Sequence, residues 1–276
     1  MVTKKNIFRI LSFSLYFVAA FMVFLVLLFP FDQVKKRIEA EVGAKTPFEL
    51  SIARISPRFA NRVLLSDVVL SDKTGRVLFE SPGIKVHLSL LGFLRGLRIV
   101  NLQGPAYGGE ISLRSEEGSK RRSWSVDASN LDIGTYGLLK NLGFKLSGTV
   151  GGNFEMVNDV GKGRIWFKNL ASRELKVKGF PVPDLDFEQG WIEAEVRGDR
   201  FMVRKLELDG KELKIRVSGD VVMRERGTMN LAIRLKPSER LSREQSGLLS
   251  FLKNRDAEGF YLFTLGGTVS EPFPRL

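Results

Sequence analysis

Alternation of apolar and polar residues along most of the chain is the feature that most limits its fold. From Leu213 to Val221 every second residue is apolar or Gly, and the residues between them are Lys, Arg, Ser and Asp. The same period of two recurs at residues 146–156, 192–197, 229–236 and 261–269. Successive side chains of a β-strand point to opposite faces, so each segment predicts a strand with one apolar and one polar face. Turn residues between the segments predict antiparallel hairpins.

Further segments of this kind lie upstream, at residues 63–71, 77–80, 84–90, 97–103 and 110–114, which brings the total to about a dozen strands. Helical patterns are few. They cover residues 91–95, 135–141 and 241–252, and in the last of these Leu241, Gln245, Leu248, Leu249 and Leu252 form one stripe. So few helices leave much of the sheet uncovered. The fold class we expect for residues 46–276 is mainly β: a strongly curved antiparallel sheet, shaped as a taco or half-barrel groove, with a few short helices.

The apolar face of such a sheet has to be covered in some way. It can close as a barrel or sandwich filled by its own side chains, form an open gutter, or lie on a partner. Glycines inside the strands permit the bends that a strongly curved sheet requires; they are Gly148, Gly152, Gly219, Gly266 and Gly267. For an open groove, the candidate lipid-lining residues are Phe154, Val196, Ile215, Val217, Leu231 and Ile233. The competing interpretation makes the same residues the ordinary core of a closed sheet.

A short pattern recurs three times: Leu-Ser-Gly-Thr-Val at 146–150, Val-Ser-Gly-Asp-Val at 217–221 and Leu-Gly-Gly-Thr-Val at 265–269. Each copy places a small kink between apolar strand residues. Chance recurrence in a Gly-rich β protein is the alternative explanation.

The N-terminal segment predicts a membrane anchor. Residues 10–29 contain no charge and are long enough, at about 1.5 Å rise per residue, to span a hydrocarbon core of roughly 30 Å. A cleaved signal peptide would have a shorter apolar stretch ending in small residues, and it is the minority alternative. Lys4, Lys5 and Arg9 favour a cytoplasmic tail at residues 1–9, although the basic residues 35–37 weaken this orientation. We therefore expect a single-pass inner-membrane protein with its body in the periplasm.

Residues 30–45 predict a short amphipathic juxtamembrane helix. Phe31, Val34, Ile38 and Val42 follow spacings of three and four, and Gly43 is expected to end the helix. Two interpretations are open: a connector that leans on the body, or a helix at the membrane surface whose basic residues meet anionic headgroups.

The composition excludes much of enzyme chemistry. The chain has no Cys and only one His, so thiolate sites and two-His zinc sites cannot form within it. His87 lies between apolar residues on a predicted strand, which disfavours a catalytic base. We interpret Glu193 and Glu195 as part of a solvated charged face rather than as a pair of catalytic carboxylates. Gly161 and Gly163 are expected in a turn and lack the Lys-Ser/Thr of a phosphate loop. We expect no enzyme activity, no cofactor and no metal.

The net charge of +12 restricts the partners. The anchor, and the lack of clustered aromatic platforms on the polar face, argue against nucleic acid. Anionic lipid headgroups or acidic partner surfaces are preferred. Exposed sheet edges are expected at residues 46–55 and 261–269, where a partner strand could pair with the chain or a helix could cap it.

Several segments together resemble the AsmA-like superfamily of envelope proteins. They are Ile-Ser-Pro-Arg at 55–58, the strand at 64–72, the strand at 83–91, Leu-Arg-Gly-Leu-Arg-Ile at 94–99 and the closing strand at 263–272. The anchor followed at once by Phe-Pro-Phe-Asp at 29–32 is most similar to the long form of the type II secretion system protein N family within that group.

This resemblance implies a bitopic inner-membrane protein of a Gram-negative bacterium, whose periplasmic part is an apolar β-groove. It implies a non-enzymatic role in type II protein secretion, with phospholipid and envelope proteins as partners; the alternative is lipid handling not dedicated to secretion. A dozen strands at about 4.8 Å spacing make a groove of roughly 50 to 60 Å, too short to bridge the periplasm unless copies stack.

Overall fold

The computed structural model describes residues 30–59, 61–119, 121–137, 139, 145–174, 176–177, 180–181, 183–223, 227–250, 252, 254–268 and 271–275, together with Phe13, Tyr16, Phe17 and Ala20. The expected tail at 1–9 and most of the expected anchor at 10–29 therefore lie outside the described residues. Within the described part, no helix is long and apolar enough to cross a membrane. The chain divides into two compact units, residues 1–90 and 91–276.

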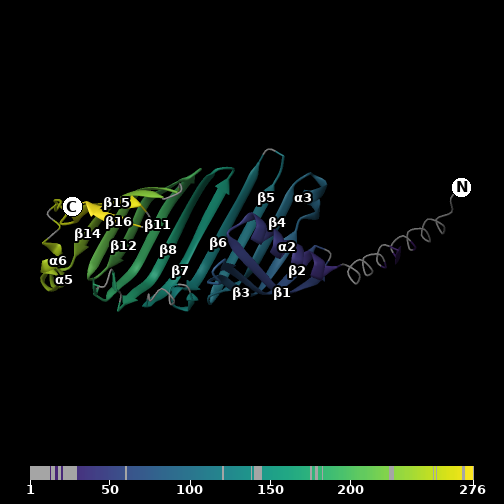
Figure 1. Ribbon diagram of the computed structural model, residues 1–276, viewed down its shortest axis with the longest axis horizontal. Helices are drawn as coiled ribbons and strands as arrows, with labels where there is room; N and C mark the ends of the chain where they lie inside the picture. The colour runs from purple at the N-terminus through teal and green to yellow at the C-terminus, as the bar shows by residue number, and fades with distance from the viewer. Residues whose placement is uncertain are drawn as a thin grey trace, which may run out of the picture. The chain divides into compact units, whose positions relative to one another are not determined.

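The described part of the first unit from residue 30 onward contains one helix and three consecutive antiparallel strands (Figure 1). These are α2 (Phe31–Lys45), β1 (Phe48–Phe59), β2 (Arg62–Asp72) and β3 (Val77–Leu88). The helix continues two residues beyond Gly43, where the sequence predicted its end. Thr46 then stops it, because its extended backbone leaves the helical path while its N–H still donates to the carbonyl of Val42.

Helix α2 packs against β1 and gives this unit its core. Ile52 of β1 is fully buried, and Ile55 and Val68 are nearly so. The backbone N–H of Ile52 donates to Glu39 Oε1 at 2.8 Å, and Lys35 Nζ donates to the carbonyl of Ala53. The described contacts therefore correspond to the connector interpretation, in which the helix leans on the body.

Strand β3 replaces the two separate strands that the sequence predicted around Ser-Pro-Gly at 81–83. Ser81 pairs with Val68 and Gly83 pairs with Ser66, so the ladder continues past Pro82 on both sides. Between these partners Asp67 adopts a left-handed backbone with φ of 48°. This kink in β2 lies opposite the proline, which has no N–H to offer to the ladder.

The second unit is an antiparallel meander of eleven strands that pair in chain order (Figure 1). They are β4 (Arg98–Ala106), β5 (Gly109–Glu117), β6 (Arg122–Asp132), β7 (Lys145–Val157), β8 (Val160–Arg173), β11 (Leu185–Arg197), β12 (Arg200–Gly210), β13 (Leu213–Val222), β14 (Thr228–Pro237), β15 (Tyr261–Thr268) and β16 (Pro272–Arg275). The first and last of these, β4 and β16, do not pair with each other, so the eleven strands do not close into a barrel. A mainly β antiparallel chain with few helices is confirmed.

The helices that the structure describes in full in the second unit are short. They are α3 (Leu90–Leu94), which begins at the last residue of the first unit, the 3-10 turn η1 (Ile133–Thr135), α5 (Glu239–Glu244) and α6 (Ser246–Leu249). The prediction of a single helix over residues 241–252 is wrong, because α5 ends at Glu244 and a separate helix, α6, begins at Ser246. A small extra pair, β9 (Lys176–Val177) and β10 (Phe180–Pro181), lies in the β8–β11 connection.

The recurring pattern of the sequence has a common conformation. Its central glycine, Gly148, Gly219 or Gly267, has φ of 125°, 141° or 98°. A side chain is strained at such angles, and a Cβ on Gly219 would lie 2.1 Å from the carbonyl oxygen of Asn230. Each copy thus marks a place where a strand bends against its neighbour. A shared backbone conformation accounts for the recurrence better than chance does.

The outermost strands have protected edges. Glu39 accepts the outward N–H of Ile52 on β1. At the other end of the strand order, β16 covers residues 264–267 of β15, and its residues Pro272 and Pro274 have no N–H to donate to a further strand.

Candidate functional site

The pairing registers sort the side chains of the second unit onto two faces. One row across the sheet runs from Phe154 through Gly163, Ala194, Val203 and Gly219 to Leu231. Directly paired residues share a face, so this row is almost entirely apolar or small. The residues next to these along each strand, such as Asn153, Arg164 and Glu193, lie on the opposite face.

Two further rows lie beside the first on the same face. One contains Ile165, Ile192, Leu206, Val217 and Ile233, and the other contains Met156, Val196, Phe201, Val221 and Met229. Ile215 shares this face too, paired with Leu208 and Leu235. All six candidate lining residues from the sequence are therefore on one face, which we call the apolar face.

Most of the apolar face is only half buried. Among the described residues of the three rows, no large apolar side chain is buried, and Ile165 is 42% exposed. The buried cluster of this unit, Leu185, Phe187 and Leu241, sits at one end of the face. Ile215 packs against that cluster. The other five candidates belong to the part of the face that nothing in the cluster covers.

Aromatic and aliphatic side chains lie flat over glycines on this face. A Cβ on Gly161 would lie 2.5 Å from Phe154 Cζ, and one on Gly163 would lie 2.7 Å from Cδ2 of the same ring. Trp124 packs against that ring from the other side, with centroids 5.1 Å apart. The sequence placed both glycines in a turn, which is wrong. They lie inside β8 because the phenylalanine ring occupies the space that side chains would fill.

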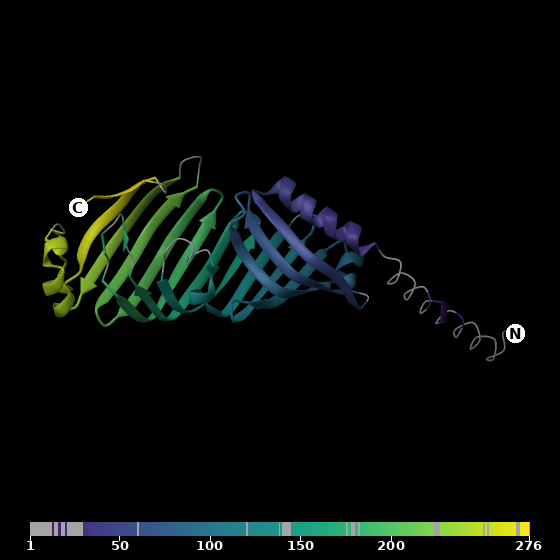
Figure 2. The same cartoon turned by 60° about the horizontal axis from the view of Figure 1, so that its bottom comes forward.

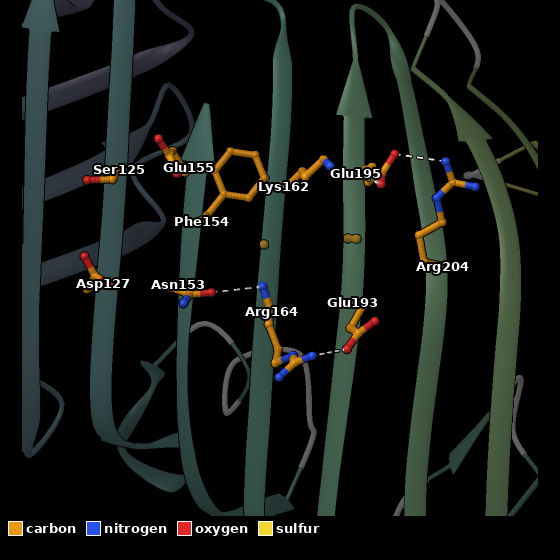
Figure 3. Close-up of a pocket in the computed structure, with 12 residues that line it drawn as sticks. Ser125, Asp127, Asn153, Phe154, Glu155, Lys162, Arg164, Glu193, Glu195 and Arg204 are labelled. Atoms are coloured by element: carbon orange, nitrogen blue, oxygen red, sulfur yellow. Dashed lines mark hydrogen bonds and ion pairs between the residues drawn. The ribbon is translucent and has the colours of Figure 1, made fainter. Parts of the chain in front are cut away.

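The opposite face carries a ladder of ion pairs across β8, β11 and β12 (Figure 3). Arg164 pairs with Glu193 on the adjacent strand. Glu195 forms ion pairs with Arg204 at 2.9 Å, with Arg197 at 3.4 Å and with Lys162 at 3.9 Å. These side chains rim a shallow hollow of about 630 Å³ that also contains Ser125, Asp127, Asn153 and Glu155. We call this surface the charged face.

The charged face does not provide an acid–base pair. The hydrogen bond from Arg204 lowers the pKa of Glu195 below its ordinary value, with the charges of Arg204, Lys162 and Arg197 acting in the same direction. A general acid requires the opposite shift, because it must hold its proton near neutral pH. The structure therefore places Glu193 and Glu195 in cross-strand ion pairs, as the solvated-face interpretation supposed.

A second hollow, of about 770 Å³, lies over the paired residues Trp166 and Trp191 on the charged face. The sequence predicted no aromatic cluster there. The signal was present as Trp166 beside Phe167 and as Trp191 in an alternating strand, but the partner strands were needed to bring the two indoles together. Lys205 Nζ lies 5.4 Å from the ring centre of Trp191. Glu188 and Glu193 line the same hollow together with Arg164, Lys168 and Lys205, so its charges are of mixed sign.

The remaining titratable candidates have structural partners. His87 Nε2 lies 2.8 Å from Asn61 Nδ2 at the end of β3. Asp184 and Asp186 both pair with Arg173. Within the described residues, no group of three acidic or imidazole side chains is arranged to hold a metal ion.

Comparison with known proteins leaves the geometry as the basis for assignment: no family model, no curated protein and no solved structure matches the chain.

Proposed function

We propose that the chain is a non-enzymatic, single-span protein of the bacterial inner membrane whose periplasmic sheet binds lipid acyl chains on its apolar face. In this proposal the strands β4–β15 form the curved, taco-shaped groove of an AsmA-like protein, and the protein serves type II secretion. The observation that carries the proposal is the half-exposed state of Phe154, Val196, Val217, Leu231 and Ile233 on one face.

The membrane part of the proposal rests on the sequence. Residues 10–29 have the length and composition of a span, and Pro30 with α2 follows directly. The basic residues before the span favour a cytoplasmic N-terminus and hence a periplasmic sheet. The absence of cysteine suits a fold that does not depend on disulfides.

Acyl-chain binding on this face is energetically reasonable. Each buried methylene contributes about 0.8 kcal/mol, so ten of them would contribute roughly 8 kcal/mol before the loss of ligand mobility. The floor suits a flexible chain because Gly161 and Gly163 let the ring of Phe154 lie flat. No polar group on the three rows would need to be desolvated.

An alternative function is that of a closed structural β-domain which recruits secretion partners through its charged face. The ladder around Glu195 gives this alternative a specific surface. Its carboxylates and cations are already paired with one another, however, and recruitment of a partner would require breaking these pairs. Lipid handling outside secretion differs only in partners, and copurification with secretion components distinguishes it.

Site-specific photocrosslinking in cells tests the proposal. A benzophenone side chain at Ile233 faces the apolar rows, whereas the same group at Ala232 lies on the charged face of the same strand. We expect lipid adducts from position 233 and none from position 232. Protein-only adducts at 233 and at Val217 would overturn the groove. Native mass spectrometry of the detergent-extracted chain provides a second readout, retained lipid.

A further inference from the structure

The segment after β3 exposes an unusual concentration of apolar side chains. In α3, Leu91 is 70% exposed, Phe93 71% and Leu94 80%, and Leu90 is also exposed. Monomeric proteins rarely leave several adjacent large apolar side chains in water. We call residues 90–94 with Arg95 the α3 tip.

The α3 tip is held in a fixed turn. The N–H of Leu97 donates to the carbonyl of Gly92, and the N–H of Gly96 donates to the carbonyl of Phe93, while Gly96 has φ of 73°. This pair of hydrogen bonds around a left-handed glycine is a Schellman motif. Gly92 is buried inside the turn. The fold thus closes the backbone locally and holds the apolar side chains outward.

Within the first unit, the last residues of β3 and the first residues of α2 lie at the same end of the unit. Lys35 contacts Ala53 and Glu39 contacts Ile52, so β1 runs on from Ala53 toward the start of the helix. Figure 2 shows α2 beside the strands of the first unit, and Phe59 at the end of β1 pairs with Arg62 across the turn into β2. Arg62, just after that turn, pairs with His87 near the end of β3. We call this the proximal end of the unit, because the apolar segment 10–29 joins it at Pro30.

The proximal end and the α3 tip carry the same chemistry. Leu88 is exposed at the proximal end, and Leu90, the first residue of the tip, is exposed two positions later in the chain. Arg58, Arg62 and Arg95 are exposed, and no ion pair to any of them occurs among the described residues. Apolar side chains with adjacent unpaired cations fit the boundary between acyl chains and anionic headgroups. An acidic protein groove would satisfy the cations, but the chain enters this end directly from the predicted span.

We propose that the α3 tip inserts into the same membrane leaflet from which residues 10–29 emerge, as a second contact with anionic phospholipid. This inference rests on the membrane attachment in the proposed function but not on groove binding. A second contact would hold residues 90–94 at the bilayer surface, close in the chain to the end of β3.

Single-cysteine labelling tests the insertion, because the chain has no native Cys. The full chain is reconstituted into phosphatidylcholine vesicles with or without phosphatidylglycerol, and an NBD dye is attached at Leu94→Cys. The matched control is Lys73→Cys, exposed in the β2–β3 turn, which precedes β3 whereas the α3 tip follows it. We expect blue-shifted emission and several-fold stronger quenching by brominated lipid at position 94 than at 73, increasing with phosphatidylglycerol.

The outcomes separate this inference from the proposed function. If carbonate extracts the chain from membranes, the anchor and both proposals fail. If the chain stays in the membrane but position 94 is quenched no more than position 73, the tip proposal alone fails. Blue-shifted emission without bromolipid quenching would mean that a protein or a second copy covers the tip, which also overturns it. The triple variant L91S/F93S/L94S should abolish the quenching of NBD at Leu90→Cys while urea unfolding stays unchanged.

Discussion

The two units bury apolar side chains to very different extents. In the first unit, a helix of fifteen residues packs against β1, and Ile52 of that strand has no exposed surface. In the second unit, the described helices that accompany the eleven strands are short. Side chains of the same type, such as Ile165 and Ile233, stay partly exposed there. Strands with similar alternation thus end in different environments because only one unit has a helix long enough to cover them. The difference leaves the apolar face of the second unit without a covering helix like α2 among the described residues.

Truncation of one isoleucine in each unit gives the largest expected contrast. Ile52→Ala should lower the free energy of unfolding by about 2 to 5 kcal/mol, since it leaves a cavity in a covered core. Ile233→Ala should cost less, because its side chain is only partly buried and its removal leaves no enclosed cavity. Urea unfolding of the detergent-solubilised chain measures both. Equal losses would mean that the apolar face is packed as tightly as the first core.

Two glycines sharpen the comparison at the backbone. Gly219→Ala should destabilise the second unit by more than about 1 kcal/mol, because φ is 141° there and a Cβ would meet the carbonyl of Asn230. Gly43→Ala should stabilise α2 by roughly 0.5 to 1 kcal/mol, since nothing lies within 4 Å of the added atom. Thermal unfolding monitored by circular dichroism gives both signs. A neutral Gly219→Ala would remove the structural meaning of the recurring pattern.

Acid should affect the two units through different interactions. A hydrogen bond from the Thr74 side chain, with others from Thr74 and Arg76, lowers the pKa of Asp72 in the first unit. Arg204 lowers that of Glu195 in the second. A carboxylate with a lowered folded pKa stabilises the fold above its unfolded pKa, and this contribution disappears as the pH falls through the folded value. The free energy of unfolding should therefore decrease as the pH drops below 4.5, where Glu195 loses its contribution. It should decrease further as the pH drops below 3.8, where Asp72 loses its own.

Variants separate these two contributions. Glu195→Gln should flatten the acid dependence at low salt and change little at high salt, because its partners are exposed charges. Asp72→Asn should remove a contribution that salt alters less, since hydrogen bonds from Thr74 and from the backbone of Arg76 add to the ion pair of Asp72 with Arg76. Unfolding curves between pH 3 and 7 at two ionic strengths are the measurement, and both effects are the smallest predicted here. A salt-independent Glu195 contribution would contradict the ion-pair account.

Strong alternation made β7, β13, β14 and β15 predictable from sequence, together with the shared face of the six candidate residues. Strands β6, β8 and β12 were not predicted. In β8, Gly161 and Gly163 imitate a turn, and only the position of the Phe154 ring explains why glycine belongs in a strand there. The continuity of β3 through Pro82 depends on a kink at Asp67 in the neighbouring strand, which no local pattern reveals.

The candidate site divides in the same way. Which side chains share a face follows from a period of two, so it could be read from the sequence. How far they are buried depends on what packs over them, and the cluster of Leu185, Phe187 and Leu241 that covers Ile215 brings together residues more than fifty positions apart. The Trp166–Trp191 pair likewise required the register of two strands.

The protected margins of β1 and β16 have a consequence for supramolecular length. Growth of a sheet from copy to copy needs free amide donors along an outer strand, and here Glu39 occupies the donor of Ile52 while Pro272 and Pro274 supply none. Lengthening the sheet by strand addition at these margins would therefore require displacing Glu39 from Ile52, or pairing without the donors that Pro272 and Pro274 lack.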